Sequence, residues 1–316
     1  MINKTQLLPS HCPVLPAEVV KWLSPAAGGQ FLDCTFGGGG HGEALFQSAE
    51  KIFLYGIDCD PSAKKRAQEF SLRHANFRFY QINFSEAECL HLPPLNGVLM
   101  DLGVSSFQLD GEDRGFSFKC HTPLDMRMDN SKGITAEKFL QTADESDLVT
   151  AIRDYGEEEQ WKKIVKTIVA NRTNPDICYA DTFAKLVASC YPKGGYGKIH
   201  PATKTFQGLR IFINNELHAL ETALPIMFDK LAIGGRLAVI SFHSLEDRIV
   251  KRFFNQMAGK SIDRFDSQSQ QDRVAYGNIL TKSPVTPTEM EIGRNPRSRS
   301  AKLRVLEKIK DRPGQR

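Results

Sequence analysis

The sequence predicts an α/β fold in which an open sheet of about seven strands is interrupted by an all-helical insertion. Two observations support this prediction. Apolar runs that end in a carboxylate or an amide alternate with helix-like stretches up to about residue 107, and the alternation resumes after His200-Pro201. The pattern between these two parts is helical only. We therefore expect one domain from residues 1–107 and 208–316, and an inserted helical domain from residues 108–207.

The first predicted strand ends at Asp33 and runs into a glycine-rich turn over residues 37–42. Glycines let the backbone turn sharply and approach a ligand closely, and a helix that follows presents unpaired N–H groups. The spacing also satisfies the dinucleotide fingerprint, although four consecutive glycines match it easily. A carboxylate at Asp33 would repel a pyrophosphate, whereas it could face the amino group of S-adenosylmethionine (SAM). Alternatively, Asp33 is a turn residue with a solvated side chain.

Three further strand ends carry polar or aromatic side chains. Residues 52–58 end in Asp58, and such a carboxylate can accept both hydroxyls of a ribose. Residues 77–84 end in Asn83 and Phe84, which suit the edge and the face of an adenine, although a single Phe is more often a core residue. Residues 96–101 end in Asp101. Because ligands bind outside the carboxyl ends of such strands, the four ends predict an adenosine-binding crevice.

The middle of the chain carries helix signals only. Thr135 resembles an N-cap, apolar residues from Trp161 to Ile168 recur at helical spacing, and residues 192–197 have the composition of a flexible loop. The elements expected in addition are a helix over 182–189, a helix over 216–231, a turn at Gly234-Gly235, a strand buried on both faces over 236–242, a helix over 249–256, and closing strands over 276–280 and 301–306.

Composition favours a soluble globular protein. The net charge is +4, and the seven cysteines are scattered without a Cys-x-x-Cys pair, which fits reduced thiols better than disulfides or a zinc site. We expect no metal. The start of the sequence lacks a signal-peptide pattern and no apolar stretch approaches membrane-spanning length, so we expect a cytoplasmic protein without membrane contact. The sequence does not decide between a monomer and a homodimer.

Several long blocks of sequence are specific enough to carry a resemblance. They lie at 33–41 (Asp-x-Thr-x-Gly-x-Gly-Gly-His), 101–110, 114–118, 123–129, 155–158, 200–203, 205–211, 234–251 and 295–304. Through them nearly the whole chain resembles the bacterial RsmH (MraW) family, SAM-dependent methyltransferases that act on the N4 of a decoding-site cytidine in 16S rRNA. The resemblance implies a Rossmann-like class I methyltransferase sheet with an antiparallel last strand. Residues 259–276 have no clear counterpart in the family.

The resemblance also implies a set of ligand-binding residues. SAM would be the cofactor, and 16S rRNA within the small ribosomal subunit would be the partner. Cofactor binding is carried over to Gly39, Gly40, His41, Asp58, Phe84, Asp101 and Gln108, in addition to Asp33 from the strand pattern.

The cytosine N4 must be activated for methyl transfer, because the lone pair of this nitrogen is delocalised into the ring and the nitrogen is a poor nucleophile. A carboxylate that accepts its N–H hydrogen bonds would favour the reactive form, and Asp101 is best placed by sequence order, although it could equally be a cofactor contact alone. His243 could orient the base, but no strong general base is required. No aromatic follows Asp101 directly, so a stacking ring would come from elsewhere, such as Phe116 or Phe118.

Basic residues indicate where RNA would bind. The strongest candidate is a cluster near the end of the chain, Arg294, Arg297, Arg299, Lys302 and Arg304. Two weaker candidates are the lysines at 162, 163 and 166, which adjoin three glutamates, and those at 193, 198 and 204, which have Tyr191 and Tyr196 available for stacking.

Three alternatives to an rRNA cytosine-N4 methyltransferase remain open from the sequence. One is a methyltransferase with a different acceptor, because the cofactor half says little about the substrate. Another is a nicotinamide oxidoreductase that uses residues 37–42. The third is a ribosome-assembly factor that binds SAM without catalysis.

Overall fold

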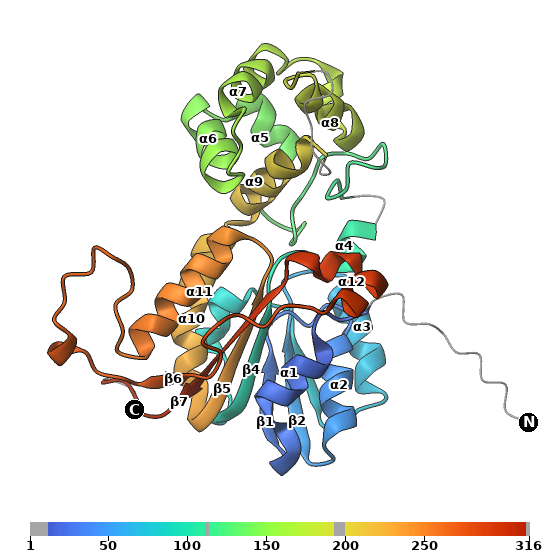
Figure 1. Cartoon of the computed structure of the whole chain (residues 1–316). Coiled ribbons are helices and arrows are strands. Elements are labelled where there is room, and N and C mark those ends of the chain that lie inside the picture. Colours follow the sequence, from blue (N-terminus) through green and yellow to red (C-terminus); the bar gives the residue numbers. More distant parts are fainter. Residues whose placement is uncertain (1–11, 111–113, 193–199, 314–316) are drawn as a thin grey trace, which may run out of the picture. The chain divides into compact units, whose positions relative to one another are not determined.

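The computed structural model describes residues 12–110, 114–192 and 200–313, and the chain forms two compact units (Figure 1). A sheet unit comprises Met1–Gly103 and Ala219–Arg316, and a helical unit comprises Val104–His218. The helical unit extends beyond the expected 108–207 at both ends. At its far end, helix α9 (Ala202–Asn214) continues through residue 207 without a break, so no boundary falls there.

The sheet unit contains the seven expected strands. They are β1 (Gly29–Asp33), β2 (Ile52–Ile57), β3 (Phe77–Tyr80), β4 (Leu95–Asp101), β5 (Leu231–Ser241), β6 (Gly277–Ile279) and β7 (Lys302–Lys308), in the order β3-β2-β1-β4-β5-β7-β6. Strands β1 to β5 pair in parallel, and β7 runs antiparallel to both of its neighbours. The predicted α/β class and the antiparallel last strand are therefore confirmed.

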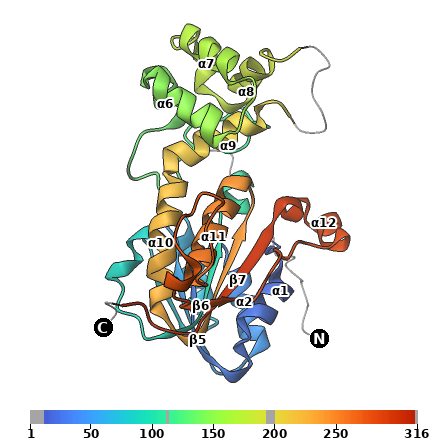
Figure 2. The same cartoon turned by 60° about the vertical axis from the view of Figure 1, so that its left-hand side comes forward.

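Helices cover both faces of this sheet, as Figures 1 and 2 show. They are α1 (Pro16–Leu23), α2 (Gly40–Ser48) and α3 (Ala63–Ser71) on one face, and α10 (Glu216–Lys230) and α11 (Ser244–Met257) on the other. Alternate strand residues point to opposite faces, so Phe31 packs with α1–α3, and Leu32 packs with α10 and α11. Both faces are buried, which is why these strands read as continuous apolar runs.

Strand β5 begins earlier than its sequence indicates. It starts at Leu231, directly after α10, whereas the glycine pair at 234 and 235 predicted a turn before a strand at 236. The glycines lie inside the strand at an irregularity, because Leu95 pairs with Leu231 while Gly97 pairs with Arg236. Residues 232–235 of β5 thus lie between these two pairs, opposite a single residue of β4.

The helical unit contains helices where the sequence predicted them, over residues 135–171 and 182–189, and two further helices that it did not predict, α4 (Ser106–Asp110) and α9. The elements within the predicted ranges are α5 (Ala136–Thr142), α6 (Glu145–Val149), a π-helical turn (Thr150–Tyr155), α7 (Trp161–Ala170) and α8 (Ala180–Ala188), and a 3₁₀ helix (Pro175–Cys178) lies between α7 and α8. Thr135 caps α5 as expected, since its side chain accepts a hydrogen bond from the backbone N–H of Lys138. Ile164, Val165 and Ile168 of α7 are buried in the core of this unit. The loop predicted over 192–197 lies almost wholly outside the described residues.

The described residues hold no helix that is both long enough and apolar enough to span a lipid bilayer.

Candidate functional site

The strand order of the sheet reverses between β1 and β4, which is the point where open α/β sheets bind ligands. Asp33 ends β1 and Asp101 ends β4, and the hydroxyl of Thr35 connects them. This hydroxyl lies 3.3 Å from Asp33 Oδ1, to which it donates, and it accepts the backbone N–H of Asp101 at 2.8 Å. The backbone N–H of Thr35 donates to the same Asp33 oxygen at 3.0 Å. The two strand ends are therefore held together as one unit.

The other oxygens of this pair have no protein partner. Asp33 Oδ2 and Asp101 Oδ1 are buried without a hydrogen bond in the described part of the chain, although Asp33 is only 1% exposed. Burial raises the pKa of Asp33 to about 6, and burial together with the charges of Asp33 and Glu246 raises the pKa of Asp101 well above its usual range. Buried polar atoms without partners are rare in folded proteins, so this pair fits a ligand that brings a positive charge or hydrogen-bond donors.

The glycine turn beside these acids has a shape that only glycine adopts without strain. Gly39 has a φ of 77° and immediately precedes α2. A Cβ at this position would lie 2.8 Å from both the Phe36 and the Phe70 rings, and one at Gly40 would lie 3.2 Å from Pro13. The turn is thus fixed by packing as well as by conformation, and it brings the N-terminus of α2 to the ligand-binding edge of the sheet.

Asp58, just after β2, holds this turn in place. Its Oδ2 accepts the backbone N–H of Gly37 at 2.8 Å, and its Oδ1 accepts that of Asp60 at 2.9 Å. Burial raises the pKa of Asp58 to about 6, and these two hydrogen bonds lower it only in part. Each carboxylate oxygen can accept a second hydrogen bond, so Asp58 retains capacity for ribose hydroxyls.

His41 lies in the first turn of α2 as a neutral side chain. Its Nε2 lies 2.8 Å from the carbonyl oxygen of Val14, which can only accept, so Nε2 carries the proton. Its Nδ1 lies 3.8 Å from Asp101 Oδ2. This distance would suit an ion pair, but burial lowers the pKa of His41 to about 4, so the ring is uncharged at neutral pH. His41 therefore supplies no positive charge that would stabilise the ionised forms of Asp33 and Asp101.

Phe84 opens the 3₁₀ helix Phe84–Cys89 that follows β3. The side-chain oxygen of Asn83 caps this helix by accepting from Ser85 N at 3.0 Å and from Ser85 Oγ at 2.8 Å. The Phe84 ring is half-buried and packs against the core on the α10–α11 face. A core role and a cofactor-contact role for Phe84 are thus compatible.

His243 caps α11. Its Nδ1 accepts the backbone N–H of Glu246 at 3.4 Å, and Glu246 Oε2 accepts the backbone N–H of Phe242 at 2.8 Å. The His243 Nε2 lies 3.1 Å from Glu246 Oε1 at an angle that makes no hydrogen bond. Glu246 is 2% exposed and contributes to the raised pKa of Asp101, so it belongs to this site. The sequence analysis missed it, although its spacing from His243 is that of a capping box.

Gln108 belongs to the helical unit. Its side-chain Oε1 accepts the backbone N–H of Ser105 at 2.9 Å, and its own backbone N–H lies 3.1 Å from the Ser105 carbonyl oxygen. Gln108 is 6% exposed, and these bonds fix the start of α4.

The basic cluster near the end of the chain is partly neutralised. Arg304 binds Asp247 through two bonds of 2.6 and 3.1 Å, and Lys302 lies 3.5 Å from the same carboxylate. Arg294 and Arg299 are exposed. The lysines at 162, 163 and 166 are also exposed, whereas those at 193 and 198 and Tyr196 lie outside the described residues. Among residues 12–110, 114–192 and 200–313, no three acidic, His or Cys side chains gather as metal ligands would.

Comparison with known proteins gives a consistent result. A family model described as the MraW methylase family matches residues 9–309. The chain is 43% identical over 307 residues to the Ribosomal RNA small subunit methyltransferase H of Rickettsia bellii, covering 95% of this chain and 99% of the relative. The protein of the same name from Neorickettsia sennetsu is 42% identical over 312 residues, with 97% and 98% covered. A solved rRNA methylase from Streptococcus thermophilus covers 92% of this chain and 93% of its own at 10% identity and a TM-score of 0.41, which is too weak a likeness to bear on fold or function.

Proposed function

The chain belongs to the MraW methylase family, and on that premise we propose that it transfers the methyl group of SAM to the exocyclic N4 of a cytidine, cytosine 1402, in 16S rRNA of the small ribosomal subunit. The observation that carries the proposal is the pair of buried, unpartnered oxygens on Asp33 and Asp101 at the switch point of the sheet. The names of the relatives at about 42% identity support the rRNA substrate.

The residues of the sheet unit fit SAM. The buried carboxylate of Asp33 would accept hydrogen bonds from the ammonium group of the methionine moiety, and Asp58 would accept those of the ribose hydroxyls. The turn at Gly39 and Gly40 would let the backbone approach the cofactor, with His41 and Asp101 beside it and Phe84 near the adenine. Gln108 is included among the proposed cofactor-binding residues only because of the resemblance to the family.

The cofactor supplies an activated methyl group, so the chain must align the acceptor nitrogen and exclude water. An ionised Asp101 would accept a hydrogen bond from the N–H of the cytosine N4, which would make the nitrogen lone pair available for in-line attack on the methyl carbon of SAM. The raised pKa of Asp101 works against ionisation in the absence of ligand. A cation bound beside Asp33 and Asp101 would favour the carboxylate form, so cofactor binding would also prepare the acceptor site.

The partners and the location follow from the substrate. Exposed arginines such as Arg294 and Arg299 would contact phosphates of the rRNA. An enzyme acting on the small ribosomal subunit would work in the cytoplasm. His243 would line the site and hold Glu246 rather than act as a base, because its Nδ1 caps α11.

The proposal is tested by methyl transfer from radiolabelled SAM to purified small subunits and to naked 16S rRNA that lack the mark, followed by nucleoside digestion. We expect the label in N4-methylcytidine. Label in another nucleoside would keep the cofactor and overturn the acceptor. Binding of SAM without transfer to either RNA would favour a non-catalytic assembly factor, and tight binding of NAD in place of SAM would favour an oxidoreductase.

A further inference from the structure

The segment before α1, residues 12–15, lies against the glycine turn of the proposed cofactor site. A Cβ at Gly40 would lie 3.2 Å from the ring of Pro13, and His41 Nε2 donates to the Val14 carbonyl oxygen at 2.8 Å. Val14 is buried in the same core as the aromatic rings that pack against the turn. The segment therefore forms part of the wall that fixes the shape of the turn.

Leu15, the last residue of this segment, has a strained backbone. Its φ is 52° and its ψ is 41°, in the left-handed region that disfavours residues other than glycine. The residue is also fully buried, with 0% of its surface exposed. Strain of this kind persists only where the surrounding structure enforces it. A contact from outside the segment must therefore hold Leu15 in this conformation.

That contact comes from helix α12 (Glu289–Arg294), near the other end of the chain. The buried N–H of Leu15 donates to Glu291 Oε1 at 2.7 Å, across a sequence separation of 276 residues. The residue that follows α12, Asn295, donates from Nδ2 to the Cys12 carbonyl oxygen at 3.1 Å. The two hydrogen bonds are made to the first and the last residue of the segment. They therefore hold both of its ends.

Helix α12 is itself held more by hydrogen bonds than by packing. None of its six residues, all of which the structure describes, is buried. Thr288 caps it by accepting the Glu291 N–H at 3.2 Å, and after it Ser298 Oγ donates to the Asn295 carbonyl oxygen at 2.8 Å. The 3₁₀ helix Pro296–Ser300 then leads into β7 (Figure 2). An element that buries so little apolar surface can release the segment before α1 without unfolding the sheet.

We propose that Glu291 and Asn295 are positioning residues for the cofactor: they hold the segment before α1 against the glycine turn and so slow the departure of SAM. The inference rests on the proposed function for the identity of the ligand. Both residues act through the backbone of the segment. Without the Glu291 carboxylate, Leu15 would lose the acceptor of a buried N–H and could relax its strained backbone. The segment would then move away from Gly40, and the turn would no longer be fixed.

The test measures the dissociation rate of radiolabelled SAM from the full chain during a chase with unlabelled SAM. Glu291→Ala removes the acceptor and should accelerate dissociation roughly tenfold, as expected when a buried N–H loses its partner. Glu291→Gln keeps a side-chain oxygen that can accept the Leu15 N–H, so it should restore a rate close to that of the wild type. Glu289→Ala removes the same charge from an exposed position of the same helix and is the matched control.

Two further measurements separate positioning from a general loss of structure. The KM for SAM should rise in Glu291→Ala, while the single-turnover rate of methyl transfer at saturating SAM stays near that of the wild type. Hydrogen exchange of the ligand-free protein should be faster over residues 12–15 and over the glycine turn in Glu291→Ala, but not in Glu289→Ala. Asn295→Ala removes the exposed bond to Cys12 alone, and should accelerate dissociation less than Glu291→Ala does.

The inference is overturned if Glu291→Ala releases SAM at the wild-type rate, or if Glu291→Gln releases it as fast as Glu291→Ala. If Glu291→Ala does not fold, an unchanged dissociation rate in Asn295→Ala overturns it instead. A wild type that binds SAM but methylates no rRNA would refute the proposed function alone, because the dissociation rates are still compared. A wild type that forms N4-methylcytidine, with equal dissociation rates in all folded variants, would refute the positioning role alone.

Discussion

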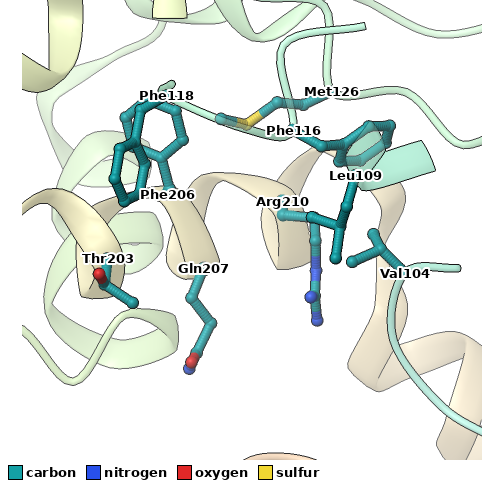
Figure 3. A pocket seen from close by; sticks show the side chains of 9 residues that line it. All are labelled: Val104, Leu109, Phe116, Phe118, Met126, Thr203, Phe206, Gln207 and Arg210. Carbon is teal, nitrogen blue, oxygen red and sulfur yellow. The ribbon is translucent and has the colours of Figure 1, made fainter. Parts of the chain in front are cut away.

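Two sites of this chain differ in how their charged groups are paired: the acids at the strand ends of the sheet unit, and the pocket of the helical unit lined by residues such as Phe116, Phe206 and Arg210 (Figure 3). In the sheet unit, Asp33 and Asp101 bury carboxylate oxygens that have no hydrogen-bond partner among the described residues, and the nearby His41 is neutral. In the helical unit, Arg210 is the one charged residue that lines the pocket, and Glu216 neutralises it. The first arrangement is unfavourable until a cation binds, whereas the second is already satisfied. The arrangement in the sheet unit fits the cationic cofactor that we propose for it.

The largest effect on this contrast should come from removing the charge of Asp101. Asp101→Asn keeps the shape of the side chain, and we expect kcat for methyl transfer to fall by a factor of about 10²–10³, as when a preorganised transition-state contact is lost. Single-turnover kinetics and the Kd for SAM are measured together. Asp154→Asn, at an exposed position of the helical unit, is the control and should leave both values unchanged. A loss confined to the Kd for SAM would make Asp101 a cofactor contact only.

The next effect concerns the pH dependence of stability in the sheet unit. Burial holds the pKa of Asp33 at about 6, above the usual 3.8, so the folded protein binds a proton more tightly than the unfolded chain. The contribution of Asp33 to the free energy of unfolding is therefore most favourable at low pH and is lost as the pH rises from about 4 to 6, by at most ~3 kcal/mol. Asp33→Asn removes this dependence. Relative to the wild type, the ligand-free variant should gain stability over that window, as measured by urea unfolding at several pH values.

Cofactor binding should show the opposite trend. A cation favours the ionised form of Asp33, so the affinity of the wild type for SAM should rise between pH 5 and pH 7, with release of protons on binding. Calorimetry in buffers of different ionisation enthalpy measures this release. Asp33→Asn should bind SAM weakly, and its affinity for SAM should rise less between pH 5 and pH 7 than that of the wild type. Equal proton release by the variant and the wild type would show that Asp33 does not face the cation.

A smaller effect is expected at Asp58. Asp58→Ala removes the hydrogen bond to Gly37 and the hydrogen bonds that we propose to the ribose, and should weaken SAM binding by roughly 1–3 kcal/mol. Unchanged affinity for SAM in calorimetry would refute the ribose assignment.

A feature of the fold or of the sites could be predicted from the sequence where it is determined by neighbouring residues along the chain. Hydrophobic periodicity and the Thr135 cap are local, and they correctly predicted helices such as α5, α7 and α8 and the succession of strands along the chain, but not α4 or α9. The start of β5 at Leu231 is set by pairing with β4, which no local pattern reveals. The burial of Glu246 and the positive φ of Met126 likewise depend on tertiary contacts. The strand-end residues that we propose for cofactor binding could therefore be selected from local sequence, whereas of the pocket lining in the helical unit only Phe116 and Phe118 were singled out.

The smallest effect compares two glycines with nearly the same backbone conformation, one in each unit. Gly39 has a φ of 77° and Gly133 has a φ of 78°, but a Cβ would lie 2.8 Å from two aromatic rings at Gly39 and meet nothing within 4 Å at Gly133. An Ala at either position should therefore destabilise the fold by about 1 kcal/mol through backbone strain. Gly39→Ala should cost about 1–3 kcal/mol more, because its Cβ clashes with side chains in a packed core. Urea unfolding of both variants measures the difference. We also expect Gly39→Ala to lower SAM affinity, because the turn must shift to relieve the clash. Equal destabilisation by the two substitutions would show that the cofactor turn is not fixed by packing, and its shape would then depend on backbone conformation alone.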